Sequence, residues 1–288
     1  MPLSAAAPFS PFSLRIRGRI VEYTRPAVMG IINVTPDSFY SGSRACGDVA
    51  ERALRMVRDG ADIIDIGACS TRPGADYVSP DEEIRRLAPA VAAIRREVPQ
   101  AVISIDTFHP EVARAAILDM GADIVNDIYG GTYSPEMIPT VAQLGVPYIL
   151  MHMRGTPATM ASMTGYPDGV AAGVLRELMP QLDLCRQAGI ADVIIDPGLG
   201  FAKTLEQNYT LLDHLPELIR ATGCPALIGI SRKSMLTRLL EITADEALCP
   251  TVALNALALD RGAAILRVHD VLPAVQAVRI HQALTSSL

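Results

Sequence analysis

Three features are missing from this sequence, and each absence argues against a class of protein. It has no run of lysine or arginine and carries a net charge of −6, which argues against nucleic acid and anionic membranes as partners. No apolar stretch reaches about eighteen residues, so no transmembrane helix is expected. The first residues, MPLSAAAPFSPFS, have no basic segment and too many prolines for a secretory signal. We therefore expect a cytoplasmic protein that binds neither nucleic acid nor membranes.

Several catalytic motifs are also absent. The five cysteines are odd in number and form no CxxC pair, a pattern typical of reduced structural thiols in the cytosol. No GxGxxG follows the first predicted strand, which argues against a dinucleotide-binding fold. Nothing resembles a Ser-His-Asp triad or a cysteine nucleophile with its base. A dinucleotide-dependent enzyme and a triad hydrolase are both disfavoured.

What the sequence does contain is a series of short, β-rich apolar runs that each stop at a polar residue. Half of the 288 residues are hydrophobic, enough for a large core. Continuous apolar runs are typical of buried parallel strands, because helices cover both faces of the sheet. Polar residues at the C-terminal ends of many such strands indicate one catalytic mouth. These residues are Asn33, Asp65, Asp106, Asn126, Asp127, Asp196, Ser231, Arg232, Lys233, Arg267, His269 and Asp270.

Strand and helix patterns alternate eight times after a β-hairpin predicted at residues 14–23. Strands are predicted at residues 27–32, 62–66, 101–105, 123–127, 147–151, 192–195, 226–230 and 263–268. Helices are predicted at residues 48–59, 79–98, 110–120, 134–144, 169–188, 205–222, 234–259 (interrupted) and 271–284. Eight right-handed βα units close into a TIM (β/α)8 barrel, with an open doubly wound sheet as the alternative. We expect residues 1–13 to be a disordered leader and residues 14–288 to form this single α/β domain.

Three polar residues at the ends of central strands are candidates for a ligand site. Asp106, Asn126 and Asp196 each follow an apolar run. A lone aspartate there is as often the N-cap of the next helix. Together the three form a ring of acceptors suited to a ligand edge rich in N–H donors. Such a ring could also hold a metal, but its spread over several strands matches an extended ligand better.

Basic residues follow the last two predicted strands. Arg232 and Lys233 lie where a strand ends and a helix begins, which favours an anion or carbonyl site. Arg267 and His269 are two residues apart, so both point the same way if the strand continues. Loops after strands seven and eight commonly hold phosphate in such barrels. We therefore predict a phosphate-binding rim around a centre of carboxylates and an amide. The rim residues are Asn33, Arg267 and His269.

Several loops admit two interpretations. NVTPDSF, from Asn33, is either a turn or a loop that closes over a ligand, and Arg72 in STRPG is either a surface residue or a presented guanidinium. In DPGLGF, the glycines allow a close approach of the backbone to a flat ligand, against which Phe201 packs. His109 and His152 are interpreted as hydrogen-bonded loop histidines.

These segments together resemble the dihydropteroate synthase family. The resemblance runs from about residue 28 to residue 270 and is carried by MGIINVTPDSF, DIIDIGACSTRPG, SIDTF, NDI, MHMRGTP, IIDPGLGF, GISRKS and RVHD. It implies condensation of 6-hydroxymethyl-7,8-dihydropterin diphosphate with p-aminobenzoate, giving 7,8-dihydropteroate and diphosphate in folate biosynthesis. It further implies an ionisation-first reaction, a Mg²⁺ cofactor, inhibition by sulfonamides and a homodimer formed through the last helices.

The resemblance also implies roles for individual residues. The pterin-binding residues are Asp106, Asn126, Met151, Asp196, Phe201 and Lys233. The diphosphate-binding residues are Asn33, Thr71, Arg72, Arg267 and His269, with Asn33 also contacting Mg²⁺. The p-aminobenzoate pocket is formed by Phe39, Thr71, Pro73, Phe201, Lys233 and Ser234. The residues closest to the chemistry are Lys233, Asp106, Arg267, His269, Phe39 and Asp65.

Two other functions fit part of the pattern. A pterin-dependent methyltransferase domain shares the barrel and the pterin-binding carboxylates, but should lack the combination of STRPG, SRKS and RVHD. A catalytically inactive pterin-binding protein should have lost Asn33, Arg267 and His269, which are present here. The chain departs from the family at Ser41, where an aspartate is usual, and this bears on how the first loop closes.

Overall fold

The computed structural model describes residues 9–34, 42–69 and 77–285. Among them, eight parallel strands form one sheet. They are β3 (Ala27–Asn33), β4 (Ile63–Gly67), β5 (Val102–Asp106), β6 (Ile124–Asp127), β7 (Tyr148–Met151), β8 (Val193–Asp196), β9 (Leu227–Ile228) and β10 (Ile265–Val268). Their order is β8-β7-β6-β5-β4-β3-β10-β9, and a bridge between Ile195 and Ala226 joins β8 to the segment that leads into β9. The predicted barrel is confirmed.

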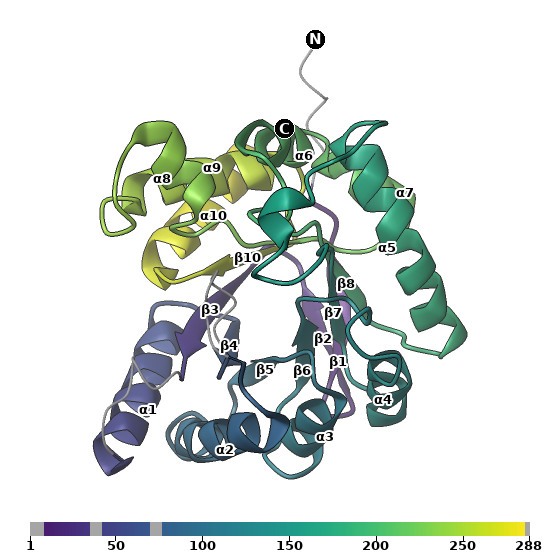
Figure 1. The fold of residues 1–288 in the computed structure, drawn as a ribbon. Helices are drawn as coiled ribbons and strands as arrows, with labels where there is room; N and C mark the ends of the chain where they lie inside the picture. Colours follow the sequence, from purple (N-terminus) through teal and green to yellow (C-terminus); the bar gives the residue numbers. More distant parts are fainter. Residues whose placement is uncertain (1–8, 35–41, 70–76, 286–288) are drawn as a thin grey trace.

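Helices surround this sheet, as Figure 1 shows. They are α1 (Gly42–Arg58), α2 (Pro80–Glu97), α3 (Pro110–Leu118), α4 (Met137–Leu144), α5 (Val170–Gln187), α6 (Leu205–Asp213), α7 (Leu215–Thr222), α8 (Ser234–Leu240), α9 (Leu248–Asp260) and α10 (Val271–Thr285). Helix α2 begins as its sequence predicts, because the Ser79 side chain accepts the Glu82 amide and Pro80 occupies the first turn. None of the helices in the described ranges is long and apolar enough to cross a membrane.

Four predicted elements differ by three residues or more from those observed. The helix predicted at residues 48–59 begins six residues earlier, at Gly42. The helix predicted at residues 205–222 is two helices, which meet at His214 directly before Leu215 and Pro216. Proline lacks the N–H that a continuous helix would need at that turn. Helix α4 begins at Met137, three residues later than predicted. Strand β9 has only two residues, because its continuation turns into the loop that carries Lys233.

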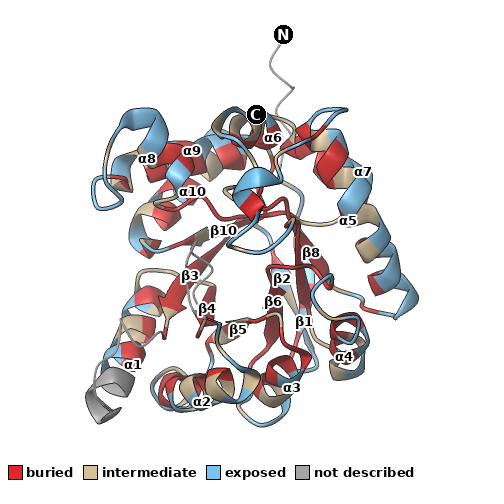
Figure 2. Cartoon of the chain, in the orientation of Figure 1, coloured by how far each residue is buried: buried red, intermediate tan, exposed pale blue. Residues whose placement is uncertain are grey.

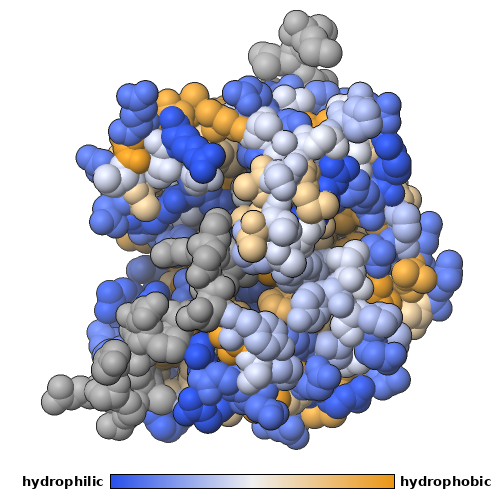
Figure 3. Space-filling model, in the orientation of Figure 1, coloured by the Kyte–Doolittle hydropathy of each residue, from blue (hydrophilic) through white to orange (hydrophobic). Residues whose placement is uncertain are grey.

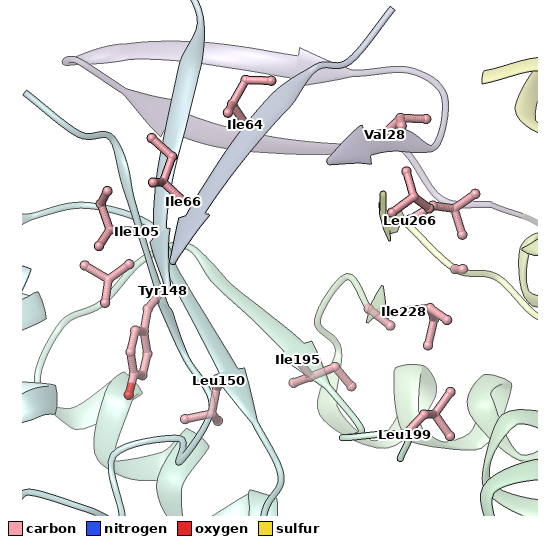
Figure 4. Packing of buried hydrophobic residues seen from close by; sticks show 14 of the residues in the cluster. Val28, Ile64, Ile66, Ile105, Tyr148, Leu150, Ile195, Leu199, Ile228 and Leu266 are labelled. Atoms are coloured by element: carbon pink, nitrogen blue, oxygen red, sulfur yellow. The ribbon is translucent and has the colours of Figure 1, made fainter. Parts of the chain in front are cut away.

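The strands are buried on both faces because their side chains alternate between the helices and the barrel interior. Val28, Ile64, Ile105 and Leu266 belong to the large core beneath the helices (Figure 4). Met29, Ile63, Ile124, Ile149, Ile194 and Ile265 form a second core inside the barrel. Figure 2 shows buried residues along the strands and mixed burial on the helices. Polar residues that follow the interior residues by two positions along a strand point the same way, toward the C-terminal mouth of the barrel.

The N-terminal hairpin closes the opposite end of the barrel. Strands β1 (Phe12–Ile16) and β2 (Arg19–Tyr23) pair in antiparallel fashion, and Leu14 packs on the inner core at 1% exposure. Truncating such a leucine to alanine costs about 2–5 kcal/mol. Arg17, in the turn of the hairpin, donates from Nε to Asp123 Oδ1 at 2.7 Å and so holds the hairpin against the barrel. The predicted hairpin is confirmed, and it starts two residues before the predicted boundary at residue 14.

Candidate active site

On five barrel strands, the last side chain that faces the barrel interior is polar. Asp65 lies two residues beyond the inward-facing Ile63, and Asn126 stands in the same relation to Ile124. Asp106, Asp196 and Arg267 occupy the equivalent positions on β5, β8 and β10. Because side chains alternate along a strand, all five point into the mouth of the barrel. The predicted gathering of strand-end polar residues is therefore observed.

Arg267 binds two of these carboxylates at once. Its Nε donates to Asp65 Oδ2 at 2.7 Å, and its Nη2 donates to Asp106 Oδ2 at 2.7 Å. The Asn126 amide also donates to both oxygens of Asp65, at 3.3 Å. Residues from β4, β5, β6 and β10 thus form one hydrogen-bonded cluster. Its fixed donors and acceptors are suited to a flat, polar ligand.

The expected position of Arg267 needs correction. The sequence predicts a position on an outer rim, yet the Arg267 side chain is 19% exposed and lies between Asp65 and Asp106. It still presents a cation to the mouth, so a phosphate contact remains compatible with its position. Arg267 belongs to the centre of the site rather than to its edge.

Lys233 occupies the other side of the mouth. Its Nζ donates to the Leu199 carbonyl at 2.7 Å and lies 4.7 Å from the ring centroid of Phe201. The ammonium also lies near Asp196, whose carboxylate accepts the Gly198 amide at 2.7 Å. A carboxylate, an ammonium and an aromatic face are therefore adjacent.

Burial shifts the pKa values of these groups. It raises the pKa of Asp106 to about 7, with the Arg267 charge acting in the opposite direction. Burial also raises the pKa of Asp196, which Lys233 partly offsets. Burial lowers the pKa of Lys233 to about 8, against the influence of Asp196. It lowers the pKa of Arg267 too, but the carboxylates of Asp65 and Asp106 outweigh burial and raise that pKa. Perturbed groups gathered in one mouth are typical of a functional site.

The loops after β9 and β10 are tied to each other. Arg232 donates from Nε and Nη2 to the two oxygens of Asp270, at 2.9 and 3.0 Å. The interpretation of Arg232 as part of an anion site is therefore wrong: its guanidinium joins the two loops. Ser231 Oγ lies 3.0 Å from His269 Nδ1, and this contact orients an otherwise exposed imidazole.

The remaining predicted site residues have different outcomes. Asn33 ends β3 and is half-buried, opposite Gly67 in the strand pairing. Met151 ends β7 and packs in an apolar cluster with Tyr129 and Met153, against which Phe201 also packs. Ser234 is exposed and is the first residue of α8. The predicted residues that lie outside the described ranges are Phe39, Ser41, Thr71, Arg72 and Pro73.

The glycines of DPGLGF have a structural role besides the predicted one. Gly198 has φ +69°, and a Cβ there would lie 1.9 Å from the His152 carbonyl oxygen. A Cβ on Gly200 would meet the Lys233 side chain at 3.1 Å. These glycines let the loop pack closely against protein, and their predicted role beside a flat ligand stays a prediction.

Three other residues act outside the mouth. Asp127 faces the helices, where it accepts the Tyr148 hydroxyl at 2.7 Å and the amides of Tyr129 and Gly131. His152 has partners at both ring nitrogens, as predicted for a hydrogen-bonded loop histidine. His109 Nδ1 contacts Glu83 at 2.9 Å, but its buried Nε2 has no hydrogen-bond partner among the residues that the structure describes, so within those residues the prediction holds for one nitrogen only.

Figure 3 shows hydrophilic residues around the periphery of this face and paler, less hydrophilic residues toward its centre. No group of three or more His, Cys, Asp or Glu side chains within the described ranges is arranged to hold a metal ion. The described part of the site therefore consists of ion pairs and hydrogen-bonding groups at the C-terminal ends of the barrel strands.

Comparison with known proteins decides which family uses this arrangement. A family model described as pterin binding enzyme matches residues 29–269. A dihydropteroate synthase from Synechocystis sp. is 47% identical over 266 residues, which is 90% of each chain. The chain belongs to the dihydropteroate synthase family. Membership makes it a transferase of folate biosynthesis, as the motifs predicted.

Solved members of the synthase family have the same fold. A Yersinia pestis dihydropteroate synthase, solved as a sulfonamide drug complex, is 39% identical, with a TM-score of 0.88 over 96% of this chain and 100% of that one. A Xanthomonas albilineans synthase, solved with 4-aminobenzoic acid, is 40% identical, with a TM-score of 0.86 over 95% of this chain and 98% of that one. These relatives favour the synthase over the methyltransferase and the inactive pterin-binding protein.

Proposed function

We propose that the barrel mouth catalyses the condensation of dihydropterin diphosphate with p-aminobenzoate. Its residues form two half-sites, one for the pterin ring and one for the diphosphate. Asp196 takes the N–H edge of the pterin through two charge-assisted hydrogen bonds, while Asp106, Asn126 and Lys233 bind the rest of the ring. Met151 and Phe201 supply apolar contacts to its faces. The observation that carries the proposal is the buried set of alternating charges on β4, β5, β8, β10 and the loop after β9.

The diphosphate half-site lies beside this pocket. Arg267 donates to phosphate oxygens from the centre of the mouth, and His269 and Asn33 contact them from the adjacent strand ends. Arg267 is already charged, because the Asp65 and Asp106 carboxylates raise its pKa. Asp65 thereby orients Arg267 without contacting the ligand. Thr71 and Arg72, outside the described residues, complete this half-site in the proposal.

Mg²⁺ fits the residues present. Asn33 supplies an amide oxygen at the end of β3, level with Gly67 and, one strand further, with Asp106. One protein oxygen suits this ion, because Mg²⁺ commonly binds substrate phosphates and retains most of its waters. When bound, Mg²⁺ would neutralise negative charge on the diphosphate. The variant Asn33→Ala should need a higher Mg²⁺ concentration for half-maximal activity than the unmodified chain does.

The reaction then needs no protein nucleophile. The carbon–oxygen bond to diphosphate breaks first, and the pterin ring delocalises the positive charge. Arg267 and His269 stabilise the diphosphate as it leaves. The aniline nitrogen of p-aminobenzoate attacks the cationic carbon and loses a proton. In the proposal Phe39, Thr71, Pro73, Phe201, Lys233 and Ser234 form the pocket that holds the aminobenzoate.

The test is synthesis of dihydropteroate by the purified chain with Mg²⁺ and both substrates. We expect product formation to require all three, and Arg267→Gln to lower kcat/KM at least a hundredfold. A matched control is Arg261→Gln, because Arg261 binds Asp213 on the helical layer. Normal turnover by Arg267→Gln, or synthesis in which diphosphate is not released, would refute these roles.

A homodimer through the last helices is part of the same proposal. Residues 252–259 are largely apolar in sequence, but within that segment Leu254 and Leu259 are buried in their own subunit. Exposed apolar side chains remain at Leu257 and, on α10, at Ile280 and favour an interface there. Light scattering of Leu257→Glu/Ile280→Glu should show a monomer where the unmodified chain shows a dimer.

A cytoplasmic location is also part of the proposal. The thiols of Cys69, Cys185, Cys224 and Cys249 are free, which is typical of a reducing compartment. Fractionation of the source cells with an antibody to the chain would test it, and recovery from an oxidising compartment would contradict it.

A further inference from the structure

The loop after β8, residues 197–204, is held by the only two lysines in the sequence. Of the 25 basic residues, all but Lys203 and Lys233 are arginine. Lys233 donates to the Leu199 carbonyl from the mouth. Lys203 donates to the carbonyls of Gly198 and Phe201, at 2.9 and 3.0 Å. Three carbonyls of one short loop therefore bind ammonium groups, and the sequence analysis assigned no role to Lys203.

Lys203 also connects this loop to the barrel wall. Its Nζ lies 3.1 Å from His152 Nδ1. Burial lowers the pKa of Lys203 to about 7, and the nearby Asp196 charge acts in the opposite direction. In its ammonium form Lys203 only donates, so Nδ1 accepts and the imidazole proton is on Nε2. Nε2 then donates to Glu177 on α5, at 3.1 Å, and Glu177 also accepts Arg154 Nε at 2.9 Å. The donors and acceptors form one directed chain from the loop to α5.

The charge states agree with this direction. Burial lowers the pKa of His152 to about 3, and the nearby Lys203 charge lowers it further. His152 is therefore neutral, as the chain of hydrogen bonds requires. The pKa of Glu177 is lowered, chiefly by its hydrogen bond to Arg154. The network thus ends on an ionised carboxylate.

The backbone of the loop explains why it needs such support. Gly198 and Gly200 have positive φ, and Ala202, which is not glycine, has φ +49°. A non-glycine residue in the left-handed region costs about 1 kcal/mol or more. Gly200 also donates its amide to the Asn208 side chain at 2.6 Å. The contacts that the two lysines make to the loop carbonyls offset this unfavourable conformation.

An arginine could not make the same contacts. Gly198 O, Phe201 O and His152 Nδ1 all lie about one hydrogen-bond length from a single nitrogen. An ammonium has three N–H donors on one atom, whereas a guanidinium spreads its donors over a plane. Lysine therefore suits three acceptors that converge on one point.

We infer that Lys203 is a positioning residue for the pterin pocket. It does not touch the ligand; it fixes the loop that begins at Asp196 and carries Phe201, so that the carboxylate and the aromatic ring face the same space. Its charge also favours the ionised form of Asp196. The inference rests on the proposed binding of the pterin by Asp196.

Calorimetric titration with 6-hydroxymethyl-7,8-dihydropterin diphosphate and Mg²⁺ tests it. We expect Lys203→Met to weaken binding at least tenfold, and Lys203→Arg to remain at least threefold weaker than the unmodified chain. The control is Arg186→Met, since Arg186 also donates to a backbone carbonyl, that of Thr222, away from the mouth. If the unmodified chain binds no pterin, the proposed function is refuted. If Lys203→Met binds the pterin with an affinity within threefold of that of the unmodified chain, this inference is refuted.

A double-mutant cycle separates positioning from general stability. In a chain that already carries Asp196→Asn, Lys203→Met should weaken pterin binding less than threefold, because the residue through which it acts is gone. Equal weakening in both backgrounds would show that Lys203 does not act through Asp196.

The two lysines also permit a measurement that needs no folded variant. Selective ¹⁵N labelling of lysine gives only two side-chain signals. The signal of Lys203 should shift when the pterin binds and should show ammonium hydrogens that exchange slowly with water. Two rapidly exchanging signals that do not respond to pterin would overturn the assignment of Lys203 to the loop.

Discussion

Replacing Asp196 by asparagine is the sharpest test of the pterin pocket. Asp196 is 6% exposed at the end of β8, and its Oδ1 accepts the Gly198 amide. Asparagine has the same size and keeps an oxygen for that amide. It replaces the second acceptor by an NH₂ group, which would face the N–H donors of the pterin. The substitution therefore removes recognition while preserving the local turn.

The expected loss follows from the bonds that disappear. A charge-assisted hydrogen bond contributes about 1.5–3 kcal/mol, and a donor left unpaired in a buried pocket adds to the cost. A total of about 3 kcal/mol corresponds to a dissociation constant on the order of a hundredfold higher. Lys233 also loses the carboxylate that opposes the lowering of its pKa by burial, so it holds its proton less well.

Calorimetry with the pterin diphosphate would measure this loss, and thermal unfolding would check the fold. Asp213→Asn is a suitable control, because Asp213 pairs with Arg261 on the helical layer. Pterin affinity within about threefold of the unmodified chain, with Asp196→Asn folded, would remove Asp196 from the pocket. Loss of affinity in the control as well would mean that charge in general, rather than this carboxylate, is responsible.

Three further outcomes are expected. Because the pKa of Asp106 is raised from 3.8 to about 7, the folded chain loses stability as pH rises between these two values. The melting temperature of Asp106→Asn should therefore rise relative to that of the unmodified chain from about pH 4 to 7 and keep a constant difference above pH 7; a constant difference below pH 7 would contradict this. Aminobenzoate should give calorimetric heat only after pterin diphosphate and Mg²⁺ are bound, and equally tight binding to the bare protein would oppose that order. Sulfamethoxazole should raise the apparent KM for aminobenzoate without lowering kcat; normal turnover with an unchanged KM would show that the pocket is wrong.

The barrel could be predicted from the sequence because its signal is local. Apart from the short β9, each barrel strand is four to seven residues long, is mostly apolar, and carries or is followed by a polar residue near its C-terminal end. The alternation of side chains then places Asp65, Asp106, Asn126 and Asp196 on one inner surface. The positions of these residues follow from counting along a strand.

What could not be predicted depends on contacts between distant segments. Arg267 is 202 residues from Asp65 and 161 from Asp106, and no local pattern shows that it bridges them. Arg232 looked like Lys233 in sequence, yet the Asp270 carboxylate draws it away from the mouth. The one sequence signal for Lys203 was its rarity, because it is one of two lysines, and rarity alone does not reveal a contact.

The hairpin β1–β2 has a kinetic consequence. It covers one end of the barrel, and Arg17 and Arg95 both bind Asp123 there. Ligands must then enter and leave through the opposite end. In the proposed reaction, the pterin at the strand ends has to arrive before the aminobenzoate, and the joined product departs through the same end. In this proposal, the hairpin β1–β2, which lies at the end of the barrel opposite the active site, helps to set the order in which substrates bind and product leaves.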